Sequence, residues 1–118
     1  MIPRKPIEKI GLIARRKIIE NPKAATFIKQ LVKYLKGKKK EVHLDSHTCE
    51  VIHAKDSCKK QDLLKKMDMV ITLGGDGTLL KTARAVSRKR VLILGVNLGN
   101  LGFLTECTPD KTFACLDG

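Results

Sequence analysis

A chain of 118 residues, of which 42% are hydrophobic, is long enough to bury the core of one domain and too apolar for a disordered tail. Its 24 Lys and Arg residues outnumber 12 Asp and Glu residues, and the net charge of +12 favours polyanionic partners such as nucleotides or nucleic acids. No apolar run approaches the roughly 20 residues that span a bilayer, and prolines and charges occupy the N-terminus where a signal peptide would be apolar. We therefore expect a cytoplasmic protein without a membrane partner.

The sequence contains no internal repeat, low-complexity tract or linker, so we treat residues 1–118 as one domain. Its four cysteines form no C-x-x-C pair, which argues against a zinc ribbon or a redox pair: Cys49, Cys58, Cys107 and Cys115. We expect free buried thiols and no protein-bound metal. Lysines at 36–40 and 59–66 carry much of the positive charge, and a solvated surface explains them.

The first half of the chain predicts strands that alternate with helices. Lys9–Ala14 (KIGLIA) has the character of a buried strand. A helix is expected to begin at Pro22 and to end at Gly37, because apolar residues repeat between them at helical spacing. Three elements follow: a strand Glu41–Asp45, a shorter strand at 51–54, and a helix over 56–67.

The second half contains two apolar strands, at 68–73 and 91–96, and each leads into a glycine-rich turn. A helix over 78–89 is expected between them with four residues turned inward: Leu79, Leu80, Ala83 and Val86. A last helix is expected to begin near residue 109. Strands that are apolar on both faces and alternate with helices predict an α/β fold, with a mostly parallel sheet covered by helices on both sides. Ligands of such sheets bind at the carboxyl ends of the strands, where both glycine turns fall.

The first turn lies in VITLGGDGT, residues 70–78. Its glycines, Gly74, Gly75 and Gly77, allow positive φ and leave room for a ligand to approach the main chain. The turn is neither a Walker loop, which ends in Gly-Lys-Ser/Thr, nor a dinucleotide fingerprint, because the G-x-G-x-x-G spacing is absent. A strand, a turn rich in N–H donors and a helix N-terminus together suit a phosphate.

Asp76 is out of keeping with simple phosphate binding, because a carboxylate repels an anion. A carboxylate beside a phosphate site can accept the proton of an attacking alcohol, so Asp76 points to phosphoryl transfer to a hydroxyl group. Asp76 could equally close an Asx turn and cap the following helix. Spacing alone leaves both interpretations open.

The second turn has the form G-x-N-x-G-x-L-G-F. Asn97 and Asn100 supply hydrogen-bonding side chains, while Gly99 and Gly102 clear space for a ligand. Phe103 could stack on a purine or nicotinamide ring, although a phenylalanine beside leucines is more often part of a core.

GGDGTLLKTAR followed by GVNLGNLGFLTE closely resembles the nucleotide-binding half of NAD kinases. These enzymes phosphorylate the 2′-hydroxyl of the adenosine ribose of NAD to give NADP. GGDGT alone also occurs in diacylglycerol kinases, and the second element separates NAD kinases from them. IGLIARR, YLKGKKKEV and DMVITL extend the resemblance over nearly the whole chain.

The resemblance implies a role for individual residues. Asp76 matches the proton acceptor, and Gly77, Lys81 and Phe103 match contacts to NAD. Gly75 and Thr78 would face the phosphates of ATP. Asn97 and Asn100 rank lower as candidate site residues. ATP or inorganic polyphosphate would be the phosphoryl donor, with Mg²⁺ or another divalent cation accompanying ATP.

In the family a second, β-rich domain follows the first one, and we expect it to be absent from this chain. Residues 1–118 would then be the N-terminal domain, inactive or nearly so alone, of an enzyme that forms homo-oligomers. A lipid kinase of the diacylglycerol type is the rival enzyme, and a basic nucleic-acid-binding module is the rival of another class. The few aromatic residues argue against binding of single-stranded nucleic acid.

Overall fold

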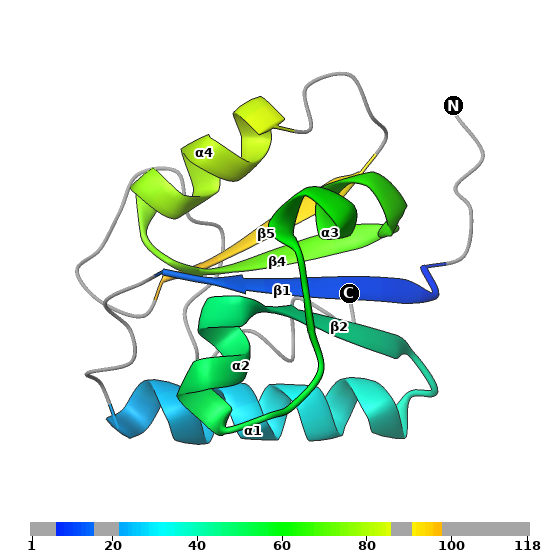
Figure 1. Ribbon diagram of the computed structural model, residues 1–118, viewed down its shortest axis with the longest axis vertical. Coiled ribbons are helices and arrows are strands. Elements are labelled where there is room, and N and C mark those ends of the chain that lie inside the picture. Colours follow the sequence, from blue (N-terminus) through cyan, green and yellow to red (C-terminus); the bar gives the residue numbers. More distant parts are fainter. Residues whose placement is uncertain (1–6, 16–21, 86–90, 98–118) are drawn as a thin grey trace.

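The computed structural model describes residues 7–15, 22–85 and 91–97. Five strands form one sheet in the order β3-β2-β1-β4-β5, and every described strand pair is parallel. Viewed along its edge, the sheet has α1 and α2 on one face and α3 and α4 on the other (Figure 1). The predicted α/β fold with helices on both faces is thus confirmed.

The elements alternate along the chain as strand and helix. In order they are β1 (Lys9–Ala14), α1 (Pro22–Gly37), β2 (Glu41–Asp45), α2 (Ser46–Ile52), β3 (Ser57–Cys58), α3 (Lys60–Lys66), β4 (Met69–Gly74), α4 (Asp76–Ala85) and β5 (Leu92–Asn97). The predicted bounds of β1, α1 and β2 are correct. The described part contains no helix that is both long and apolar enough to cross a membrane.

Each face of the sheet has its own apolar core. On the side of α1, residues that alternate along the strands pack against the apolar stripe of the helix, including Leu12, Ile71, Phe27, Ile28 and Leu31. On the opposite side, α3 packs onto the sheet through a smaller set: Ile13, Leu63, Leu64, Met67 and Val70. Burial on both faces explains why the central strands read as uninterrupted apolar runs.

The predicted strand at 51–54 is wrong, because Val51 and Ile52 belong to helix α2. Asp45 caps this helix: its Oδ1 accepts a hydrogen bond of 2.9 Å from the N–H of Thr48. The helix ends at His53, whose φ of 55° lies in the left-handed region. The apolar residues Val51 and Ile52 suit either a strand or a helix, and the Asp45 cap at the end of β2 selects the helix.

The predicted helix over 56–67 is too long at its start. Ser57 and Cys58 form the edge strand β3, which pairs with Leu44 and Asp45 of β2. Hydrogen bonds to the sheet thus override local helical spacing, and the helix begins only at Lys60.

The helical face of α4 differs from the prediction. Thr82 is fully buried, Leu79 is half-buried, and Leu80 and Ala83 are exposed, whereas Val86 lies outside the described residues. The Oγ1 of Thr82 donates to the carbonyl oxygen of Thr78 at 2.9 Å, and this satisfies the buried hydroxyl group. Thr82 is therefore buried, whereas Leu80 and Ala83, which the apolar pattern predicted to be buried, are exposed.

The chain leaves β1 toward β2 on one side and enters β4 on the other, so strand order reverses between β1 and β4. In doubly wound sheets the crevice beside such a reversal, at the carboxyl ends of the strands, is the usual ligand site. A hydrogen bond of 2.8 Å from the N–H of Arg15 to the carbonyl oxygen of Leu73 joins the two strand ends there.

Candidate active site

The first glycine turn lies at this reversal point. Gly74 is the last residue of β4, Gly75 follows it, and α4 begins at Asp76. The N–H of Leu79 donates to the carbonyl oxygen of Gly75 at 3.2 Å, which marks the first turn of the helix. The N-terminus of α4 and the positive end of its dipole therefore lie at the carboxyl edge of the sheet.

Gly74 is required by packing. A β-carbon at this position would lie 2.8 Å from Oγ1 of Thr78 and 2.9 Å from Cβ of Arg15. The turn does not use the positive φ that glycine allows, because none of Gly74, Gly75 and Gly77 has a positive φ. Close approach of two segments, and not a left-handed backbone, is what excludes a side chain at Gly74.

Gly75 and Gly77 differ from Gly74, because a β-carbon on either would meet no atom within 4 Å. Gly75 is half-buried and Gly77 is exposed. The main chain of the turn is thus open on the side of these two residues. Backbone N–H groups at the start of a ten-residue helix, beside open space, form a surface that suits a phosphate.

The other predicted residues of the first turn fall on two faces of α4. Asp76 provides the first residue of the helix at the carboxyl edge of β4. Thr78 is half-buried and directs Oγ1 toward the α-carbon of Gly74. Lys81 is exposed and follows Gly77 by one helical turn, so these two share the outer face of α4.

Asn97 is the last residue of β5, and in the sheet register it lies opposite Gly74. The two glycine turns therefore begin side by side, as predicted from their positions after parallel strands. The remainder of the second turn lies outside the described residues: Asn100, Gly99, Gly102 and Phe103.

Arg15 belongs to the same site, and the sequence reasoning missed it. It follows β1 directly, is exposed, and packs its Cβ against the main chain of Gly74. A basic residue directly after the first strand was the available signal, since in this topology β1 ends beside β4. Within residues 7–15, 22–85 and 91–97 no three His, Cys, Asp or Glu residues are grouped so as to hold a metal ion.

Fold and site together define a doubly wound α/β domain with an open glycine turn at its switch point. The sequence profile of the ATP-NAD kinase N-terminal domain matches residues 10–118, and the chain belongs to this family. Its sequence is 35% identical over 111 residues to the NAD kinase of Geotalea daltonii and 38% identical over 104 residues to that of Saccharophagus degradans. These alignments cover 94% and 86% of this chain but 38% and 34% of the relatives.

A solved structure shares the fold. The crystal structure of yeast NADH kinase complexed with NADH superposes with a TM-score of 0.77, at 20% sequence identity, over 97% of this chain and 38% of that one. The chain therefore spans little more than a third of the length of the proteins it matches. The resemblance to NAD kinases stated from the two glycine motifs is confirmed.

Proposed function

We propose that this chain is the nucleotide-binding domain of an enzyme that transfers the γ-phosphoryl group of ATP to the 2′-hydroxyl of the adenosine ribose of NAD, giving NADP. One observation carries the proposal: Asp76 begins a helix beside open, glycine-lined main chain at the point where strand order reverses. Membership of the NAD kinase family and the net charge of +12 support the proposal that the substrates are polyanions.

Asp76 acts as the general base in this proposal. Its carboxylate accepts the proton of the ribose hydroxyl as the new oxygen–phosphorus bond forms and the bond to the leaving ADP oxygen breaks. An aspartate is a weak base, but the loose transition state of phosphoryl transfer requires little early deprotonation, and correct positioning contributes most. The position of Asp76 next to phosphate-facing N–H groups suits both substrates at once.

The remaining site residues divide between the two substrates. Gly75, Thr78 and Arg15 face the phosphates of ATP, and Gly77, Lys81, Asn97 and Phe103 contact NAD. Mg²⁺ enters as the MgATP complex, because this ion keeps its waters and binds through substrate phosphates more readily than through a protein cage. Inorganic polyphosphate offers the same chemistry as an alternative donor.

Substitution of Asp76 by Asn in the complete protein tests the assignment. The proposal expects kcat for NADP formation to fall by about 10³-fold while the dissociation constant of NAD changes little. Asp56→Asn is the matched control, since Asp56 is an exposed aspartate of the loop before β3. A variant at position 76 that retains full kcat would refute the general base.

The complete enzyme requires residues beyond this domain in our proposal, and it forms homo-oligomers in the cytoplasm. A coupled NADP assay on residues 1–118 alone should give little or no turnover. Robust turnover would contradict the need for a second domain but would leave the assignment of Asp76 open to the preceding test. Phosphorylation of a lipid headgroup without any response to NAD would favour a lipid kinase instead.

A further inference from the structure

A thiol, an imidazole and a carboxylate form a chain at the opposite side of the sheet from α1. The Nδ1 of His43 lies 3.6 Å from Sγ of Cys58, and its Nε2 lies 2.8 Å from Oε1 of Glu41. Glu41 and His43 are two residues apart on β2 and so share one face, while Cys58 ends the neighbouring strand β3. The glycine turns use none of these three residues.

The hydrogen bonds fix the direction in which a proton moves. An ionised carboxylate only accepts, so Nε2 of His43 must donate to Glu41. In the neutral imidazole Nδ1 is then the acceptor, and the thiol of Cys58 is the donor. This arrangement prepares Cys58 to lose its proton to His43, with Glu41 stabilising the imidazolium.

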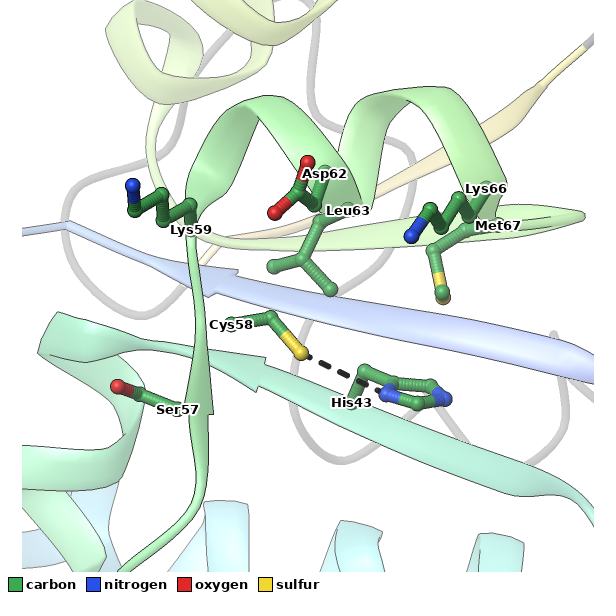
Figure 2. A pocket seen from close by; sticks show the side chains of 8 residues that line it. All are labelled: His43, Ser57, Cys58, Lys59, Asp62, Leu63, Lys66 and Met67. Carbon is green, nitrogen blue, oxygen red and sulfur yellow. Dashed lines mark hydrogen bonds between the residues drawn. The ribbon is translucent and has the colours of Figure 1, made fainter.

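Cys58 and His43 line a cavity of 380 Å³ below α3 (Figure 2). This volume lies within the range of small-molecule sites. Lys59 precedes α3 and Lys66 ends it, so a cation stands at each end of the helix, with the carboxylate of Asp62 between them. Two cations and one carboxylate complement a ligand that carries two carboxylates and one ammonium group.

We propose that Cys58 is a thiol–disulfide exchange site for a small disulfide of the glutathione type, bound in this cavity. Each half of glutathione disulfide carries two carboxylates and one ammonium group. Lys59 and Lys66 bind the carboxylates, and Asp62 binds the ammonium group.

The exchange at Cys58 needs no further oxidant or reductant. Cys58 gives its proton to Nδ1 of His43, and its sulfur attacks one sulfur of the disulfide. A new sulfur–sulfur bond joins Cys58 to one glutathionyl group, the original sulfur–sulfur bond breaks, and the second glutathione leaves as a thiolate that takes up the proton from His43. Cys58 is oxidised and one half of the disulfide is reduced.

Cys49 provides an internal control. It is 5% exposed, whereas Cys58 is half-buried and open to the cavity. We incubate the complete chain with glutathione disulfide, quench with acid, and cleave after Lys55, which separates the two cysteines. Mass spectrometry should find the glutathionyl group on Cys58 at least about tenfold faster than on Cys49. Equal rates would overturn the proposal.

Substitution of the imidazole tests the proton transfer. His43→Gln should slow exchange at Cys58 by about tenfold or more, since a positioned base is removed. His53→Asn is the control, because His53 is exposed and asparagine tolerates its left-handed backbone. An unchanged rate in His43→Gln, with circular dichroism showing a folded protein, would show that the three groups are only structural.

Charge recognition is tested by comparing disulfides. The unsubstituted chain should react several times faster with glutathione disulfide than with the uncharged hydroxyethyl disulfide, and Lys66→Met should reduce this ratio by about threefold. Lys65→Met is the control, because Lys65 is exposed on the same helix but does not line the cavity. Equal rates with both disulfides would refute the assigned ligand class and leave a reactive thiol without selectivity.

Discussion

Arg15 and Gly74 are in such close contact that a β-carbon on Gly74 would stand 2.9 Å from Cβ of Arg15. The residue that follows β1 is thereby packed against the residue that ends β4. The hydrogen bond from Arg15 N–H to the Leu73 carbonyl oxygen holds the same two segments together. The first strand thus contributes to the position of the glycine turn, although 59 positions separate Arg15 from Gly74.

Gly74→Ala should destabilise the protein. The added methyl group would contact Thr78 Oγ1 at 2.8 Å as well as Arg15, and one of the two segments must move. Overpacking of this kind typically costs about 1–3 kcal/mol of the free energy of unfolding, which urea titration measures. An alanine that leaves this free energy unchanged would mean that the turn adjusts without strain.

Gly75→Ala is the matched control for that substitution. A β-carbon on Gly75 meets nothing within 4 Å and its φ is not positive, so stability should change by less than about 0.5 kcal/mol. Under the proposed function the same methyl group stands where ATP phosphates approach. We therefore expect a raised KM for ATP in Gly75→Ala. If this variant lost stability and kept its KM for ATP, Gly75 would have a packing role and no role in ATP binding.

Arg15→Gln should weaken binding of the phosphoryl donor. Under the proposed function Arg15 pairs with phosphate oxygens, and loss of one such charge-assisted contact should raise KM for ATP by about tenfold, with KM for NAD little changed. Arg84→Gln is the control, since Arg84 is an exposed arginine in the last turn of α4. Equal effects of the two substitutions would indicate general electrostatic attraction, and steady-state kinetics on the complete protein distinguish these outcomes.

The sequence predicted those elements whose own pattern decides their structure. α1 has a helical apolar stripe between proline and glycine, and β4 and β5 are mostly apolar, so local rules suffice. The prediction failed at α2, where the Asp45 cap at the end of β2 selects a helix, and at β3, which needs β2 as its pairing partner. Cys58 joins the sheet only because β2 offers it an edge.

The candidate site was predicted through its glycines but not through its packing. Nothing in GGDGT shows that Gly74 touches Arg15 or that Thr82 takes the buried position of α4. The contact of Gly74 with Arg15 arises from strand order, which places β1 beside β4, and the burial of Thr82 arises from the packing of α4 on β4 and β5. The periodicity of apolar residues describes one helix or strand at a time, so it cannot predict contacts between elements.

Thr48→Val should be strongly destabilising for its size. Thr48 is fully buried on α2, and its Oγ1 accepts a hydrogen bond of 3.0 Å from the N–H of Ala14, beyond the last residue of β1 that pairs with β2. Valine keeps the shape but leaves a buried N–H without its acceptor, at a cost of about 1–3 kcal/mol. Thr48→Ser retains the hydroxyl group and should recover part of the loss. Chemical denaturation compares the three proteins, and equal stability of the valine and threonine forms would contradict the role of this bond.

Cys49 should make the protein less stable at alkaline pH. Burial, with the carboxylate of Asp45 as a second cause, raises the pKa of this thiol above its ordinary value of 9.0. The folded chain then holds the thiol proton more tightly than the unfolded chain. The resulting stability is complete below the unfolded pKa and is lost as the pH rises through the folded pKa.

The free energy of unfolding, measured by urea titration between pH 7 and about 11, tests this expectation. Cys49→Ala should show a shallower alkaline decline than the unsubstituted chain, because lysine titration is common to both and cancels in the comparison. Cys58→Ala removes only a lesser cause of the raised Cys49 pKa, so it should keep most of the decline. If Cys49→Ala declines as steeply as the unsubstituted chain, the buried thiol is not the group that titrates.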